Sequence, residues 1–399
     1  MRLDGPDPVN HRPALRDLGS YGDRPLPVIR RRPLVLAPLR PDADDVAGKA
    51  DRIEKLISSS GWFQWVSKGE ISDAVQTLKD ADAETAKAVV AELDERGRLD
   101  DLFDEIYDGS HVGGGLEGDD RRAFFEDMAG KLDGASLARM ANEAKRHGGY
   151  TGLEAMTEFA GAVAAHASSD AKVEFVRSLA DETLVSDTTS SAFAFVDPDA
   201  VAIATVLASM GDDPASLRRA MASLDDKQLQ SVMYSSVDRV VIGPAVVDDV
   251  DGYVALADAV AQLDASDPAE RAQIRRFIGF SMDRLGDDEF IRRLQPEYKD
   301  ALTSVFLTHF DDLLGASLSD NGAIDREFAE DIESFAHFIL FSDPAGESLQ
   351  ELQHSCQSGS PIWWTWRRAS AAMAARDSGT RQSGAKRRRT LPDSCLPTA

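Results

Sequence analysis

The chain has 399 residues, of which 43% are hydrophobic, 28% charged and 7% aromatic, and its formal net charge is −25. This length suits two or three domains or one helical array, whereas the modest glycine content and the two cysteines exclude collagen and disulfide scaffolds. No apolar run approaches the roughly 18 residues that a membrane-spanning helix needs, so we expect no membrane-spanning segment.

Residues 1–44 are predicted to form a disordered leader. They contain eight prolines, a density that no helix or central strand tolerates, and their net charge is +2. Arg30–Arg32 and the apolar residues 33–39 imitate the charged and apolar regions of a signal peptide. This apolar part is short and contains two prolines, so we expect no general secretory signal. Localisation stays open between export by another route and the cytoplasm.

The body of the chain is predicted to be all-α, an array of short antiparallel helices stacked as hairpins. We divide it into helical blocks 45–195 and 196–345. Apolar positions recur there at three- and four-residue spacing, which is typical of amphipathic helices. Such apolar stripes must be buried, so helix has to pack on helix. One example is the stripe of Ala86, Val89, Val90 and Leu93 within residues 83–96.

Asp-Pro pairs mark several helix starts. The aspartate accepts hydrogen bonds from the free amides of the first turn, and proline suits the first helical position because it has no N–H to satisfy. We therefore expect helices to begin near residues 198, 214 and 268. The pairs are Asp197-Pro198, Asp213-Pro214, Asp267-Pro268 and Asp343-Pro344. Further predicted caps are Asp133, Asp225 and Asp287, and predicted stops are Gly97, Gly148-Gly149, Gly211 and Gly286.

Residues 237–250 are the one concentration of β-branched residues in the body. They are compatible with a short strand, but Gly243-Pro244 interrupts the run. We therefore favour a connector between helical blocks at this place.

Residues 346–399 are predicted to be a basic, low-complexity tail. Its last 40 residues carry a net charge of +6, and Trp363, Trp364 and Trp366 lie beside two arginines. Such a segment can stack on single-stranded bases, and Lys386–Arg389 can serve as a nuclear address, but a disordered extension is the interpretation we favour. Its abrupt change of composition also suggests a fused or frame-shifted end.

The charges of the two ends leave −33 on residues 45–359. A body this acidic repels phosphate backbones, so we expect it to bind no nucleic acid. The helical blocks, residues 45–345, also contain no thiol, because Cys356 and Cys395 lie in the predicted tail. Neither a disulfide nor a cysteine-based zinc site can therefore hold the core.

Two stretches of the sequence resemble ligand-binding motifs, and neither motif is complete. Residues 113–118 match G-x-G-x-x-G, but an acidic helical stretch precedes them where a dinucleotide site needs a strand, so we expect no cofactor. Residues 317–328 resemble a calcium loop, with Phe328 in place of the closing glutamate. A helix-capping turn is the favoured interpretation, and Asp320, Asn321 and Asp325 are the candidate calcium ligands.

Catalytic residues cannot be assigned from the sequence. The seven histidines form neither H-x-x-x-H nor H-E-x-x-H, and no Walker A motif or G-x-S-x-G elbow is present. His166 and His337 lie in apolar surroundings, which favours buried core histidines. His309 has Asp311 and Asp312 nearby, which is uninformative in a chain with 69 carboxylates.

Residues 114–140 and 163–179 resemble helical segments of large secreted bacterial proteins of the polymorphic-toxin type. In that family such segments are non-catalytic spacers or delivery regions, and a separate end domain carries the toxicity. The resemblance implies a bacterial origin and export, and it transfers no catalytic residue. No recognisable toxin domain follows residue 345 here, which departs from the family's pattern.

Three functions are compatible with these observations. The first is a non-catalytic acidic helical interaction or delivery module that binds a protein partner. The second is a hydrolase whose site is assembled from distant residues, and the third is a weak calcium-responsive protein. Substrate and oligomeric state cannot be read from the sequence.

Overall fold

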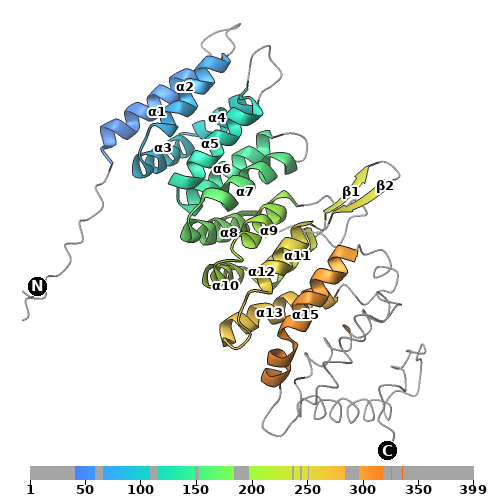
Figure 1. Ribbon diagram of the computed structural model, residues 1–399. Coiled ribbons are helices and arrows are strands. Elements are labelled where there is room, and N and C mark those ends of the chain that lie inside the picture. Colours follow the sequence, from blue (N-terminus) through green and yellow to red (C-terminus); the bar gives the residue numbers. More distant parts are fainter. Residues whose placement is uncertain are drawn as a thin grey trace, which may run out of the picture. The chain divides into compact units, whose positions relative to one another are not determined.

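The helices of this chain bury their apolar stripes against one another. The computed structural model describes residues 41–58, 66–107, 115–148, 152–183, 197–235, 238–242, 245–249, 251–283 and 296–317, together with Asp325 and Phe335. Fourteen helices and one β-hairpin lie within these residues (Figure 1). The predicted all-α stack of short helices is confirmed. No helix in these ranges combines the length and apolarity that crossing a bilayer requires.

The helices are numbered as in Figure 1. The first eight are α1 (Ala43–Ile57), α2 (Lys68–Lys79), α3 (Ala83–Glu95), α4 (Arg98–Tyr107), α5 (Gly118–Lys131), α6 (Gly134–His147), α7 (Leu153–His166) and α8 (Ser169–Thr183). The others are α9 (Pro198–Ala208), α10 (Pro214–Ser223), α11 (Asp226–Ser235), α12 (Asp251–Val260), α13 (Pro268–Asp283) and α15 (Pro296–Ser317).

The predicted Asp-Pro starts are confirmed at three positions. Helices α9, α10 and α13 begin at Pro198, Pro214 and Pro268. In each case the preceding aspartate accepts hydrogen bonds from amides of the first turn, as Asp267 Oδ1 does from Ala269 at 2.7 Å. Local hydrogen bonding therefore fixes these boundaries.

Other predicted caps and stops hold as well. Asp133 caps α6 and Asp225 accepts from the amide of Gln228 at the start of α11. Gly97 has a φ of 67° in the turn between α3 and α4, a conformation that glycine adopts without a steric penalty. Gly148 is the C-cap of α6. The predicted signals at Gly149, Gly286, Asp287 and Asp343-Pro344 lie outside the described residues.

Most helices pack on a helix two or three places further along the chain, as α6 does on α8, α7 on α9 and α9 on α12. From α5 onward this produces two rows of neighbours, one formed by α5, α7, α9, α12 and α15 and the other by α6, α8, α10 and α13. Polar contacts also join helices: Arg121 of α5 binds Glu158 of α7, 37 positions away, and Lys145 of α6 binds Asp199 of α9, 54 positions away.

One hydrophobic cluster runs through the whole stack, from Val46 to Phe335. It includes the predicted stripe of residues 83–96, whose four apolar members are fully buried. Phe125 lies at the centre of its first half, with its ring centroid 4.9 Å from that of Phe159 and 6.2 Å from that of Phe103.

Only the start of the first predicted helical block can be compared with the described residues. The helical unit begins at Pro41, and α1 begins two residues before the predicted block at 45. The predicted division at 195–196 lies outside the described residues, and the helices on either side of it, α8 and α9, pack against each other.

The segment expected to be a plain connector forms a hairpin. Strands β1 (Asp238–Ile242) and β2 (Ala245–Asp249) pair antiparallel, with Ile242 opposite Ala245. Gly243-Pro244, which was expected to interrupt a strand, instead separates two strands that satisfy each other's backbone groups. The hairpin still connects α11 to α12, as the prediction of a connector requires.

Candidate functional site

Polar side chains meet where α4 packs on α6. Helix α4 buries Leu99, Leu102, Phe103 and Ile106, which leaves Asp100 and Asp104 together on another face, one turn apart. Helix α6 carries Glu143 and His147 at the same spacing. Because α4 contacts α6, the two pairs face each other. With Arg146 these residues form what we name the α4–α6 cluster.

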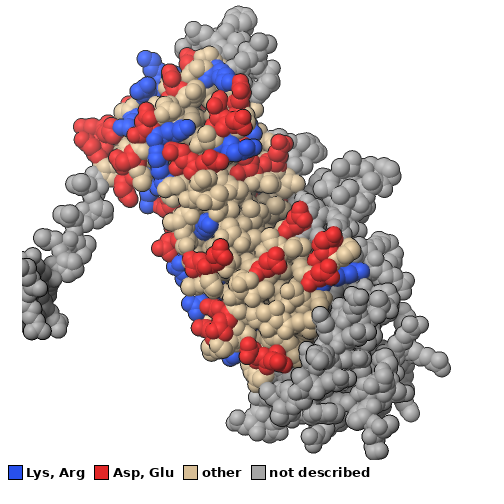
Figure 2. Space-filling view, viewed as in Figure 1, with Lys and Arg blue, Asp and Glu red and all other residues tan. Residues whose placement is uncertain are grey.

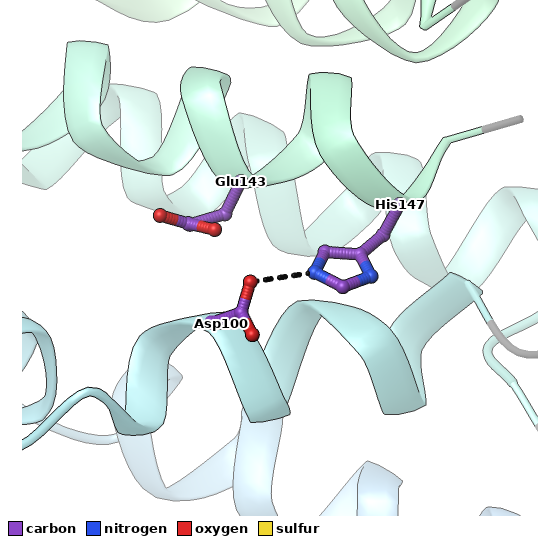
Figure 3. Close-up of side chains that lie close together, drawn as sticks. All are labelled: Asp100, Glu143 and His147. Carbon is purple, nitrogen blue, oxygen red and sulfur yellow. Dashed lines mark hydrogen bonds and ion pairs between the residues drawn. The ribbon is translucent and has the colours of Figure 1, made fainter.

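The His147 ring lies between two carboxylates. Its Nε2 is 2.9 Å from Oδ1 of Asp100 (Figure 3), and its Nδ1 is 3.1 Å from Oδ1 of Asp104. Arg146 Nη1 donates to both oxygens of Glu143, at 3.0 and 3.1 Å, and lies 3.9 Å from Asp100. Each of these five side chains thus lies within ion-pair or hydrogen-bond distance of another member of the cluster.

The cluster ranges from nearly buried to half exposed. The Glu143 side chain is 9% exposed and that of His147 is 18% exposed, whereas that of Asp100 is 52% exposed. A hydrogen bond with the His147 ring lowers the pKa of Asp100 below its usual range, and burial raises the pKa of Glu143. Burial therefore favours the neutral form of one carboxyl, and hydrogen bonding favours the charged form of the other.

The α4–α6 cluster provides donor atoms for a metal ion but little space for a substrate. One imidazole nitrogen and two carboxylate oxygens, from His147, Asp100 and Glu143, all lie within 4.8 Å of one another. Such a mixed nitrogen and oxygen set suits a borderline divalent metal such as zinc. General acid–base catalysis would need a substrate against Glu143, whose side chain is largely covered.

The predicted calcium ligands are not brought together within the described residues. Asp325 accepts from Arg275 Nη2 at 2.7 Å, and its amide donates to the carbonyl of Ser317 at 2.9 Å. Asp320 and Asn321 lie outside the described residues. A guanidinium on the Asp325 carboxylate competes with a cation, and calcium binding there stays a prediction.

The histidines differ from their predicted roles. His166 is exposed at the end of α7, 4.0 Å from Glu126, so its interpretation as a core histidine is wrong. The buried residues of α7 end at Val163, and Ala165 beside His166 is exposed as well. His309 is buried, with Nε2 3.4 Å from the carbonyl of Val260, and His337 lies outside the described residues.

Sequence reasoning missed His147. Searching for paired histidines could not find it, because this cluster contains a single histidine. A usable signal was present in the two i, i+4 pairs, Asp100 with Asp104 and Glu143 with His147. The two pairs come close to each other only because α4 packs on α6.

A second feature is an open hollow of about 370 Å³ between α1 and α2. Four aspartates line it together with Lys49 and Arg52. We name it the acidic hollow; its aspartates are Asp44, Asp45, Asp73 and Asp80, all of them exposed.

No protein-family model matches the chain, and no curated protein does. Among solved structures, the chain is similar to the crystal structure of an engineered protein, at 17% identity over 84% of this chain and 83% of that one. The TM-score of that comparison is 0.31, too low to support an argument about fold or function.

Proposed function

We propose that this chain is a non-catalytic acidic helical interaction or delivery module of an exported bacterial protein, and that it binds a basic segment of a partner protein. The observation that supports this proposal is an excess of carboxylates over basic side chains, most of which are already paired. Carboxylates outnumber basic side chains by 69 to 44 in the chain. Most basic side chains of the described helices are already in ion pairs within the stack, so the excess charge available to a partner is negative.

Many of these ion pairs connect helices that pack on each other. Arg121 of α5 binds Glu158 of α7 at 2.8 Å, and Arg219 of α10 binds Asp170 of α8 at 2.9 Å. In Figure 2, basic and acidic side chains are interspersed over the upper part of the described surface, and the lower part carries separate acidic patches with basic side chains at its edges. The basic side chains thus stabilise contacts between helices. The carboxylates in excess of these ion pairs create a negative potential that attracts a basic partner.

The acidic hollow is where we place the contact with the partner. Its four aspartates exceed its two basic residues, and Lys49 is already paired with Asp45 on the same helix. A hollow of this size accommodates a lysine or arginine side chain of the partner, whose charge the aspartates complement. The bacterial origin and export in this proposal rest on the family resemblance of residues 114–140 and 163–179.

A hydrolase assembled from distant residues is the alternative function. The α4–α6 cluster would have to supply its acid, base or metal, because it brings together residues more than forty positions apart. The side chain of Glu143 is only 9% exposed, which leaves little access for a substrate. The acidic surface therefore supports the interaction module better.

The proposal is tested by binding of short lysine- and arginine-rich peptides, taken from proteins encoded beside this gene, to the full chain in fluorescence anisotropy. We expect binding that weakens with added salt and that Asp73→Asn with Asp80→Asn reduces about tenfold. The matched control is Asp258→Asn with Asp311→Asn, which removes equal charge from exposed positions on α12 and α15. Absent binding, or equal loss in both double variants, would refute the proposal.

A further inference from the structure

We propose that Asp100, Glu143 and His147 form a zinc site that ties α4 to α6. Nothing in the interaction function requires a metal, so this inference goes beyond that function. The three donor atoms lie within 4.8 Å of one another, and no other group of three such side chains meets this condition in the described part of the chain. Figure 3 shows Asp100 rising from one helix toward Glu143 and His147 on the other.

The donor atoms must adjust their spacing to accept an ion. Zinc bonds to nitrogen and oxygen donors at about 2.1 Å, which in a tetrahedral site places donors about 3.4 Å apart. The His147 Nε2 and the Asp100 Oδ1 are 2.9 Å apart and would have to separate slightly, whereas the most distant donors of the group, which lie within 4.8 Å, would have to approach each other. The Asp100 side chain is half exposed, so it can adjust its rotamer, and solvent can reach the fourth position.

Asp104 supplies the support that a ligating histidine requires. Its Oδ1 lies 3.1 Å from Nδ1 of His147, on the opposite side of the ring from Asp100. When an ion replaces the hydrogen bond between Nε2 and Asp100, a proton held on Nδ1 by Asp104 leaves the lone pair of Nε2 available to the ion. Ligating histidines in proteins commonly donate their second nitrogen to a carboxylate in this way. Because the group contains a histidine that is held by the Asp104 carboxylate, it differs from a cluster made of acidic residues alone.

The charges of the cluster also favour a divalent cation. A zinc ion binds Glu143 in its ionised form and so displaces the proton that burial favours in the metal-free protein. With Glu143 ionised and the imidazole neutral, the carboxylates of Asp100, Asp104 and Glu143 and the guanidinium of Arg146 sum to −2, which one zinc ion neutralises. Arg146 competes for Glu143 in the metal-free protein, but its side chain is 62% exposed and can turn into solvent. Bound zinc would replace its two hydrogen bonds to Glu143 by a direct ligand bond.

The test is titration of the full chain with Zn²⁺ by calorimetry after treatment with a chelator. Cys356 and Cys395 are first replaced by serine, because free thiols bind zinc on their own. We expect one ion per chain. His147→Ala, Glu143→Gln and Asp100→Asn should each weaken binding by about tenfold or more, and Asp104→Asn by about tenfold through orientation of the ring.

His166→Ala is the matched control, because His166 is exposed on α7 with a single carboxylate at 4.0 Å, and it should leave the titration unchanged. Visible absorption of Co²⁺ in the same protein gives a second readout, and its tetrahedral bands should disappear in His147→Ala. Far-ultraviolet circular dichroism verifies that each variant is folded. If His147→Ala does not fold, Asp104→Asn takes its place in the test, because it keeps a polar partner for Nδ1. Absent zinc binding by the thiol-free protein, or binding by the folded His147 and Asp104 variants as tight as that of the thiol-free protein, would overturn the proposal.

Discussion

The ion pair between Lys145 and Asp199 is the best place to test how the stack is held together. Lys145 lies on α6 and Asp199 in the first turn of α9, with Nζ and Oδ2 2.6 Å apart. The Asp199 side chain is only 4% exposed, and its Oδ1 is buried without a hydrogen-bond partner among the described residues. Lys145→Met removes the cation, keeps most of the aliphatic stem, and leaves a buried carboxylate unpaired.

The expected loss of stability follows from this burial. Removing one partner of a buried ion pair costs about 3–5 kcal/mol, because the other charge stays desolvated. The amides at the start of α9 stabilise a carboxylate in the first turn by about 0.3–1 kcal/mol, which offsets part of that loss. We therefore expect Lys145→Met to lower the free energy of unfolding by about 3 kcal/mol, and Lys145→Met with Asp199→Asn to lower it by only about 1 kcal/mol.

Urea unfolding followed by circular dichroism at 222 nm measures these differences, and urea is preferred to guanidinium because it does not screen charge. Lys49→Met is the matched control, since Lys49 pairs with Asp45 at exposed positions one turn apart on α1. Its loss should stay below about 0.5 kcal/mol. The reasoning fails if Lys145→Met costs no more than Lys49→Met, or if Asp199→Asn gives no rescue.

Two further predictions concern close packing and pH. Gly134→Ala should destabilise the protein by about 1–3 kcal/mol in urea unfolding, because its Cβ would overlap the backbone of α8, whereas Gly161→Ala, with open space around it in α7, should stabilise by about 0.5–1 kcal/mol. Equal effects of the two changes would contradict this account. Burial lowers the pKa of His309 in the fold despite the nearby Asp264 and Asp312, so the unfolded chain binds the proton more readily. This contribution to stability is therefore present at pH 7 and is lost as pH falls below about 6.5, and His309→Asn should flatten that part of the urea-midpoint profile against pH.

The sequence by itself determined the helical elements. The starts at Pro198, Pro214 and Pro268 are read correctly because an aspartate cap and the amides it binds lie within three residues of each other. The buried stripe of residues 83–96 is likewise set by helical periodicity alone. These features depend on neighbours in the chain, and such neighbours are visible in one sequence.

Only the tertiary structure decided the candidate site and the exceptions to local pattern. His147 meets Asp104 and Asp100 across 43 and 47 residues, a distance that no local pattern encodes. His166 is exposed although its neighbours in the sequence are apolar, because the packing that buries α7 ends at Val163. In both cases the decisive contact joins side chains of different helices, and which helices meet depends on the packing of the whole stack.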